Sequence, residues 1–515
     1  MDSRGAGAPA ARAVSMIEEP QLILPNVDAE PGASGPQLSK LPRARRVFVN
    51  RSLRMDHVDW VGFDMDYTLA IYRQDEIESL SIEATVKKLV DRGYPPYLAE
   101  ARYETRFPMR GLFIDKRHGN VLKMDRYKYV GRAWHGMREL PREERHALYH
   151  ARKLRVAAPR FHWIDTLYAL PEAALYAGAV EVLERYGANV DYAWLFNDIR
   201  ECIDEAHRDG SIVDVIAREL PRFVERDEEL GPTLHKLRSA GKRLFLLTNS
   251  RWSYTDNMMR WLLPGGLSEY PTWRQYFDAV VCAAAKPVFF TEKRPLMERL
   301  VELPGEPTRA AYSVERGRVY EGGNLRDFER MIDAQGDRVL YVGDHIFGDI
   351  LRSKKDSSWR TVMIIQEMDH ELDAMERNRD AVSQLDSMAR RWTRLEDELR
   401  YYQSRHRALA RANGRRGELD GDVGDELSEV RRAIDALKGA MRALDRQWRE
   451  LERRTDDEFH PWWGSLFKQG AELSSFGDQV EEYACLYTSR VSNLLSYSPT
   501  QYFRSPRDLM PHEMP

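Results

Sequence analysis

The stretch VGFDMDYTLA, from Val61 to Ala70, places a short apolar run directly before two carboxylates, Asp64 and Asp66. A continuous apolar run that stops at turn residues is typical of a strand buried on both faces. Residues at i and i+2 just past the end of such a strand can both face a ligand when the chain turns there. The stretch therefore predicts a buried strand whose end carries a pair of acids.

Four later segments repeat the pattern of an apolar run that ends in polar residues. They are RLFLLTNS, ending at Ser250, FDAVVCAAAKP, with Lys286, VLYVGDHIFGD, with Asp344, and TVMIIQE, residues 361–367. Helical patterns separate them, as in LGPTLHKLRSAG before Lys242. Strands and helices in alternation indicate an α/β fold with a parallel sheet. Ligands on such sheets bind at the carboxyl ends of the strands, where these polar residues are expected.

The gap between DMDYT and LLTNS predicts an inserted domain. Roughly 180 residues separate the two motifs, far more than one crossover connection needs. We therefore expect a catalytic core split between 46–75 and 215–375, with a cap over 76–214. An insertion at the catalytic end of a sheet would cover the site like a lid.

Heptad spacing replaces this pattern after residue 380. Large side chains recur at alternating intervals of three and four from Leu385 to Leu409, and again from Leu427 to Leu451. A Gly- and charge-rich break separates the two stripes. Two matched stripes predict an antiparallel coiled-coil hairpin over 376–460. The hairpin would be a structural arm or an oligomer contact, or else a docking arm, because its exposed faces are rich in Arg.

Composition excludes several classes of function. The 515 residues contain 78 Lys and Arg and 82 Asp and Glu, a formal net charge of −4, which argues against a dedicated nucleic-acid binder. No stretch approaches the ~18 apolar residues of a membrane span. Three cysteines are too few for a disulfide framework, so we expect a cytoplasmic protein. Residues 1–45, rich in Gly, Ala and Pro, do not resemble a signal peptide and are predicted to be a disordered tail.

The polar strand ends carry the groups that phosphoryl transfer needs. In the acid pair, one carboxylate can attack phosphorus or hold Mg²⁺ while the other moves a proton to the leaving oxygen. The phosphoryl oxygens also need positive charge, which Lys286 and a bound Mg²⁺ would supply. Thr248 and Asn249 offer a hydroxyl, an amide and backbone N–H groups. Asp344 and Asp349 add carboxylates, one for the metal and one to hold the lysine.

The order of these motifs is more informative than any one of them, since each is common by chance. DMDYT, LLTNS, Lys286 and GDHIFGD resemble, in that order, the haloacid dehalogenase (HAD) superfamily. VFVNRSLRM, FPMRGLFID, KPVFF and DLMPHE also resemble the cytosolic purine 5'-nucleotidase family, which prefers IMP and GMP. The resemblance covers about residues 46–370 and 460–513. It implies a Rossmann-like core with a large cap and a C-terminal helical segment, 461–515, that packs back on the core.

The resemblance also implies a role for each matching residue. Asp64 would be the nucleophile that becomes aspartyl-phosphate, and Asp66 would be the general acid and then the base. Mg²⁺ would bind Asp64, the backbone carbonyl of Asp66, and Asp344, while Asp349 would position the lysine. The phosphate would be bound by Thr248, Asn249, Ser250 and Lys286.

In the cap, the stretch DIRECIDEAH matches the helix with which the family reads purine and ribose. Arg200, Asp204 and His207 fall on its matching positions, and Tyr168 stands where the family has a stacking aromatic. A carboxylate such as Asp204 can accept from N1–H of hypoxanthine or guanine and cannot pair that way with adenine. The alternatives are a surface helix pair for Asp204 and His207, a solvated Arg200, and a Tyr168 in the cap core.

Two positions depart from the family near its effector site. Asp165 stands where the vertebrate enzyme has Asn, and Glu482 replaces an Arg that contacts the effector. The reversed charge should weaken binding of an anionic nucleotide, so we expect ATP-type activation to be lost. His345 and Phe347 keep the segment that lines the effector site, or serve the fold alone.

These observations favour a Mg²⁺-dependent 5'-nucleotidase that hydrolyses GMP or IMP through an aspartyl-phosphate. Its partner would be a purine nucleoside monophosphate, with no nucleic acid and no membrane, and the phosphoenzyme could also pass its phosphate to a nucleoside. The family is tetrameric, which favours a homo-oligomer, either a dimer or a tetramer. The alternatives are a HAD phosphatase of another substrate, and a non-catalytic protein that works through the coiled coil.

Overall fold

The structure is a computed structural model that describes residues 41–150, 154–265, 268–345, 358–416 and 421–506. Contacts divide the chain into two units, Met1–Leu41 and Pro42–Pro515, and all the elements below lie in the second unit. The predicted positions Phe347 and Asp349, and nearly all of the predicted tail, lie outside the described residues. Within those residues we find no helix with the length and apolar character of a membrane span.

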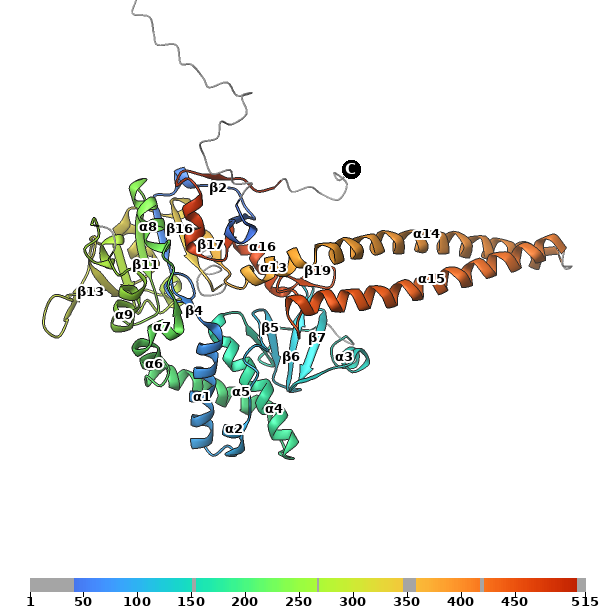
Figure 1. The fold of residues 1–515 in the computed structure, drawn as a ribbon, viewed down its shortest axis with the longest axis horizontal. Helices are drawn as coiled ribbons and strands as arrows, with labels where there is room; N and C mark the ends of the chain where they lie inside the picture. Colours follow the sequence, from blue (N-terminus) through green and yellow to red (C-terminus); the bar gives the residue numbers. More distant parts are fainter. Residues whose placement is uncertain (1–40, 151–153, 266–267, 346–357, 417–420, 507–515) are drawn as a thin grey trace, which may run out of the picture. The chain divides into compact units, whose positions relative to one another are not determined.

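A ten-stranded sheet forms the centre of the second unit (Figure 1). All five predicted strands are present, and they lie side by side and parallel in the order β17-β16-β3-β11-β12. Their bounds are β3 (Trp60–Phe63), β11 (Arg243–Leu247), β12 (Ala279–Cys282), β16 (Val339–Gly343) and β17 (Arg360–Ile364). Every residue of β3, β12 and β16 is buried, as expected for parallel strands covered on both faces. The predicted α/β class is confirmed.

Further strands extend the sheet on both sides of the five central strands. Beyond β12 lie β15 (Val319–Gly322), β13 (Leu296–Arg299) and β14 (Thr308–Ala310). Beyond β17 lie β20 (Leu486–Thr488) and β1 (Phe48–Val49). The C-terminal segment therefore supplies a strand as well as the helix α16 (Ser475–Tyr483). The sequence pattern did not predict β20, because a strand of three residues is too short to show a hydrophobic period and its pairing partners, β1 and β17, are distant in sequence.

Helices and one close contact hold the central strands in place. Helices α8 (Leu230–Ser239), α9 (Trp252–Leu262) and α11 (Leu325–Ile332) lie between central strands in the chain, and α13 (Met368–Arg377) follows β17. In β3, Gly62 lies against the ring of Phe245, and a Cβ at this glycine would lie 2.1 Å from a ring carbon. Only a residue without a side chain lets β3 pass there, directly before the two acids.

The insertion leaves and re-enters the core through two paired strands, β4 (Ile71–Tyr72) and β10 (Val224–Glu225). Between them, an antiparallel sheet has the order β8-β7-β6-β5-β9. Its strands are β5 (Leu112–Asp115), β6 (Asn120–Met124), β7 (Val130–His135), β8 (Arg138–Glu139) and β9 (Phe161–Ile164). Three packed helices accompany it: α1 (Gln74–Asp91), α4 (Leu170–Arg185) and α5 (Tyr192–Arg208). Helix α5 contains the predicted substrate-reading residues, and Asp191 caps its start by accepting from two backbone N–H groups.

Two long helices follow the core, and Figure 1 shows them side by side. They are α14 (Arg379–Arg416) and α15 (Gly421–Phe459), longer than the predicted arms of about 25 residues. Among the heptad positions, Leu409, Val430 and Leu444 are buried. Arg405 of α14 donates to the Glu426 carboxylate of α15. A helical pair is therefore present, while its action as a coiled coil and the domain boundaries given above stay predictions.

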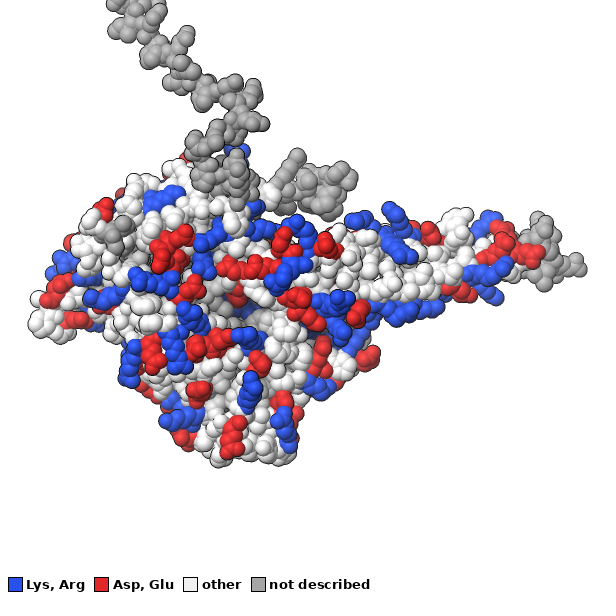
Figure 2. All heavy atoms as spheres, viewed as in Figure 1, with Lys and Arg blue, Asp and Glu red and all other residues white. Residues whose placement is uncertain are grey.

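Charge is mixed over the surface. On the face drawn in Figure 2, basic and acidic side chains alternate over short distances. With a net charge of −4, the chain has no overall excess of positive charge for an anionic substrate. Such a substrate must be met by cations placed locally in the site.

Candidate active site

The acid pair lies at the carboxyl end of β3, where the chain turns sharply. Asp64 and Asp66 are 8% and 7% exposed. The Asp64 N–H donates to the Val342 carbonyl of β16 at 2.9 Å, which continues the sheet pairing to the first acid. Tyr67 then adopts a left-handed φ of +56°, a costly conformation for a residue with a side chain. Asp64 and Asp66 both line one cavity at this end of the strand.

Lys286 approaches the first acid from the loop after β12. Its Nζ lies 2.8 Å from Asp64 Oδ1 and donates to the Tyr341 hydroxyl at 2.9 Å. The Asn249 amide fixes the lysine backbone, since its Nδ2 donates to the Lys286 carbonyl at 2.9 Å and its Oδ1 accepts from the Lys286 N–H at 2.5 Å. The loops after β11 and β12 thus hold the lysine against the Asp64 carboxylate.

In the loop after β11, the three residues that were predicted to bind phosphate differ in where they lie relative to the cavity. Thr248 is completely buried, and its Oγ1 accepts from the Ser250 N–H at 3.1 Å. It is not among the residues that line the cavity, so its side chain supports the loop. Ser250 does line the cavity, but its hydroxyl donates to Asp66 Oδ2 at 2.7 Å. Asn249 is the member of this trio whose side chain lines the cavity and also holds Lys286.

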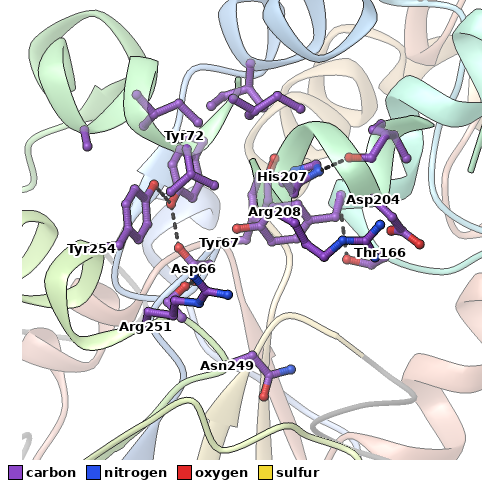
Figure 3. Close-up of a pocket in the computed structure, with 18 of the residues that line it drawn as sticks. Asp66, Tyr67, Tyr72, Thr166, Asp204, His207, Arg208, Asn249, Arg251 and Tyr254 are labelled. Atoms are coloured by element: carbon purple, nitrogen blue, oxygen red, sulfur yellow. Dashed lines mark hydrogen bonds between the residues drawn. The ribbon is translucent and has the colours of Figure 1, made fainter. Parts of the chain in front are cut away.

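Asp66 has the environment of a general acid. The Tyr72 hydroxyl donates to its Oδ1 at 2.5 Å and lies 2.9 Å from the Tyr254 hydroxyl (Figure 3). Burial raises the pKa of Asp66 above its usual range, and hydrogen bonds from Tyr72 and Ser250 offset part of that rise. A carboxyl group with a raised pKa can hold the proton that a leaving oxygen needs. Neither tyrosine stood out in the sequence, because no motif spacing links them to the acid pair.

Asp344 follows β16 and lines the same cavity, with 3% of its surface exposed. In the sheet, Phe63 of β3 is paired with Val342 of β16. Asp64 is the first residue after Phe63 and Asp344 is the second after Val342, so both acids lie just past the ends of neighbouring strands. The next residue, His345, also lines the cavity, and its Nε2 lies 3.2 Å from Asp165 Oδ2.

The arrangement fits a hard divalent cation. Two carboxylates, Asp64 and Asp344, and the backbone carbonyl of Asp66 are oxygen donors of the kind Mg²⁺ prefers, and this ion keeps several waters. In the part of the chain that the structure describes, no three His, Cys, Asp or Glu side chains gather as a metal centre. The predicted set is compatible with that finding, since it uses only two side chains and one carbonyl.

The cap closes the other side of a cavity of about 900 Å³. Tyr168 is among the residues that line it. Asp204 and His207 of α5 line it as well (Figure 3). Tyr168 is 39% exposed and lies edge-on to Tyr67, with ring centroids 4.9 Å apart. The volume of this cavity is within the range of pockets that enclose small-molecule ligands. In α/β folds such pockets lie at the carboxyl ends of the strands. Core and cap therefore share one site.

Arg200 does not line this cavity, unlike its neighbours on α5. Its Nε lies 3.4 Å from Glu172 Oε2, and Glu172 does line the cavity although it is only 7% exposed. Burial raises the pKa of Glu172 to about 7, while Arg200 acts in the opposite direction. No motif in the sequence pointed to Glu172, because it lies in an otherwise mostly apolar helix, α4 (Leu170–Arg185).

Comparison with known proteins gives a consistent result along the chain. A family model described as the 5' nucleotidase family matches residues 47–515. A 5'-nucleotidase domain-containing protein of Dictyostelium discoideum is 29% identical over 475 residues, which cover 91% of this chain and 74% of that protein. Human 5'-nucleotidase domain-containing protein 2 is 28% identical over 494 residues, covering 93% of this chain and 87% of that protein.

Solved structures align only in part. An archaeal beta-phosphoglucomutase from Pyrococcus has 9% identity and a TM-score of 0.27, covering 60% of this chain and 86% of that chain. The L-2-haloacid dehalogenase of Xanthobacter autotrophicus has 13% identity and a TM-score of 0.21, covering 60% and 78%. Scores this low carry no argument about the present site.

Proposed function

Because the chain belongs to the 5' nucleotidase family, we propose that it is a Mg²⁺-dependent 5'-nucleotidase acting on purine nucleoside monophosphates, GMP or IMP first. Family membership makes it a phosphoric monoester hydrolase. One observation carries the rest of the proposal. Asp64, Asp66 and Lys286 of the core share a single cavity with Tyr168 and Asp204 of the cap.

In the first step Asp64 attacks phosphorus. A bond forms between its carboxylate oxygen and phosphorus, while the bond from phosphorus to the nucleoside 5' oxygen breaks. Asp66, whose pKa burial raises above its usual range, acts as the general acid and donates a proton to that departing oxygen. Lys286, within 2.8 Å of the nucleophile, stabilises the negative charge on the transferring phosphoryl oxygens.

In the second step water releases the phosphate. Asp66, now a carboxylate, takes a proton from a water molecule whose oxygen attacks phosphorus. The bond between Asp64 and phosphorus breaks, and inorganic phosphate leaves with both carboxyl groups restored. A nucleoside hydroxyl in place of water would receive the phosphoryl group instead, which is the phosphotransferase reaction that we include in the proposal.

A bound Mg²⁺ would neutralise charge on the phosphate and lower the barrier to attack. Asp64, the Asp66 carbonyl and Asp344 would hold it, since all three belong to the strand ends that line or border the cavity. The remaining positions would be filled by water and substrate oxygens, as is usual for this ion.

Base selection is assigned to the cap. Asp204 lines the cavity on the same helix as His207, and its carboxylate can accept from N1–H of a 6-oxopurine. Adenine has no proton at N1, so the same carboxylate would face a lone pair and repel it. Tyr168 offers an aromatic surface on which a purine can stack.

Two arginines support a second candidate, a phosphatase whose substrate carries a further anionic group. Arg208 and Arg251 both line the cavity (Figure 3). Both side chains are exposed at the site. Among the described residues, neither of them has an ion-pair partner. A nucleotide with a second phosphate, or a phosphorylated sugar acid, would use them better than GMP or IMP does.

The compartment and the assembly are further parts of the proposal. Cys202, Cys282 and Cys485 are buried and not disulfide-bonded, which supports a reducing cytoplasm. We include a homo-oligomer, a dimer or a tetramer, because the family that the sequence resembles is tetrameric.

A substrate panel tests the proposal. Phosphate release by the purified chain is measured with GMP, IMP, AMP, a nucleoside 3',5'-bisphosphate and an aryl phosphate, each with Mg²⁺ and with EDTA. We expect the highest kcat/KM with GMP or IMP, and no activity in EDTA. Preference for the bisphosphate would favour the second candidate, and full activity in EDTA would refute the metal requirement.

A further inference from the structure

Arg110 is a buried cation that reaches the catalytic core from the base of the cap. It directly precedes Gly111 and β5, and only 1% of its surface is exposed. Its Nη1 donates to the backbone carbonyl of Asp344 at 2.8 Å. Its Nε and Nη2 donate to the Glu367 carboxylate at 2.8 and 2.6 Å.

The two hydrogen bonds from Arg110 to the Glu367 carboxylate form a fork, and this fork fixes the direction of the third bond, to the Asp344 carbonyl. The guanidinium group is planar, so two parallel bonds to one carboxylate leave it almost no freedom to rotate. The group also lies over the ring of Phe476, 4.9 Å from the ring centre. With one edge held by Glu367 and one face by Phe476, Nη1 can point only at the Asp344 carbonyl.

The Asp344 peptide needs such a restraint. Sheet pairing between β16 and β17 ends at Gly343 and Met363, so the Asp344 carbonyl lies beyond the last paired residues. The direction of this peptide sets where the attached carboxylate lies. A bond from a buried arginine to this carbonyl therefore acts on the metal-binding side chain through its own backbone.

A second contact reaches the same turn from the cap. The Gly111 N–H donates to the Ile164 carbonyl at 2.7 Å, which joins the start of β5 to the end of β9. The residue after β9 is Asp165, whose Oδ2 lies 3.2 Å from His345 Nε2. Gly111 itself lies so close to Phe476 that an added Cβ would be 2.6 Å from the phenylalanine Cβ. The first residues of the cap sheet are thus packed tightly against the turn at Asp344.

We propose that Arg110 is a positioning residue that holds Asp344 in its metal-binding place and fastens the base of the cap sheet to that turn. The inference rests on the proposed function, since it takes Asp344 as a ligand of the cation. It adds a residue whose contribution comes from its three hydrogen bonds and not from contact with substrate.

Three variants separate positioning from simple stability. Arg110→Lys keeps the charge and loses the fork. Arg110→Met removes the donor and leaves Glu367 without its partner. The double variant Arg110→Met/Glu367→Met replaces the ion pair with apolar side chains, which proteins often tolerate well. Mn²⁺ alone serves as the probe, and its binding is measured by electron paramagnetic resonance, beside thermal melting of each variant.

Lys123 provides a matched control. It is another buried cation at 3% exposure, and it donates to the carbonyls of Trp463, Ser465 and Lys468 at 2.7, 2.6 and 2.7 Å. Lys123 thus joins the cap to the C-terminal segment, and none of these three hydrogen bonds involves Asp344. Lys123→Met should lower the melting temperature and leave the Mn²⁺ dissociation constant within about twofold of wild type.

We expect the Mn²⁺ dissociation constant to rise roughly 10- to 100-fold in Arg110→Met and in the double variant, with a smaller rise in Arg110→Lys. The double variant should melt closer to wild type than Arg110→Met. Wild-type Mn²⁺ affinity in the folded double variant would overturn the proposal, and so would a wild-type protein that binds no Mn²⁺. If the double variant does not fold, unchanged affinity in Arg110→Lys overturns it instead.

This design keeps two failures apart. If the chain hydrolyses no nucleotide but the Arg110 variants still lose Mn²⁺ while Lys123→Met does not, the positioning role stands and the proposed substrate falls. If hydrolysis is normal and the variants bind Mn²⁺ as wild type does, the positioning role falls and the proposed function stands.

Discussion

The Nζ atom of Lys286 lies 2.8 Å from Oδ1 of Asp64, and the two side chains are only 3% and 12% exposed. The residues come from the ends of β12 and β3, which are separated in the sheet by β11. A buried ion pair of this kind holds both charges in place, because removal of either leaves the other uncompensated. The contact places a buried cation beside the carboxylate that the proposal assigns as the nucleophile.

Asp64→Asn should abolish turnover. An amide oxygen is a poor nucleophile, so we expect kcat to fall on the order of 10⁴-fold or more. Asp59→Asn is the matched control, since Asp59 precedes the same strand and pairs with Arg338 at the far end. It should keep nearly full activity. Phosphate release measured on both folded variants decides the matter, and substantial turnover by Asp64→Asn would remove the nucleophile assignment.

Asp66→Asn should affect substrates according to their leaving group. A nucleoside 5' oxygen needs a proton as it departs, whereas an aryl oxide leaves without one. We expect a loss of about 10²- to 10⁴-fold with GMP and a clearly smaller loss in the first step with an aryl phosphate. Pre-steady-state release of the aryl alcohol measures that step by itself. Equal losses on the two substrates would contradict the acid role.

Asp204→Ala should damage use of GMP and IMP more than use of a simple aryl phosphate. The carboxylate is assigned to N1–H of the base, which an aryl phosphate does not have. A loss of roughly 10- to 100-fold in kcat/KM is expected, as for one buried polar contact. Glu201→Ala on the same helix is the control, because its 70% exposed carboxylate pairs with Arg92 away from the cavity.

Glu172→Gln should change how stability depends on pH. The folded-state pKa of Glu172 is raised to about 7 by burial, so its contribution is fully present below its unfolded pKa near 4 and is lost as pH rises through 7. Gln cannot ionise, so the variant should avoid this loss, worth up to roughly 3 kcal/mol at pH 8. Titratable and charged groups facing Glu172 are Arg200, His162, Asp204 and Asp165.

Melting temperatures of wild type and Glu172→Gln from pH 5 to pH 8.5 provide the measurement. The difference between variant and wild type should become more positive as pH rises through 7. A difference that stays constant over the range would show that Glu172 titrates as an ordinary surface glutamate. The attraction between Arg200 and ionised Glu172 is already contained in the pKa of about 7, since Arg200 acts against the rise that burial causes.

The sequence by itself determined the five central strands of the sheet. Each of the five predicted strands is an apolar run bounded by turn residues, and burial on both faces leaves that local pattern in the chain. The acid pair follows directly from two positions, Asp64 and Asp66, because the strand end itself fixes where they emerge. Order of motifs was enough to indicate the family that the whole-chain comparison shows.

Tertiary structure decided which side chains face the cavity and which support it. Thr248 is fully buried and accepts from the Ser250 N–H, while Arg200 lies against Glu172. Arg110 reaches Asp344 across 234 positions of sequence, a contact that no local spacing encodes. Hydrophobic period is a property of neighbouring residues, whereas these pairings depend on strand order and on how cap and core pack.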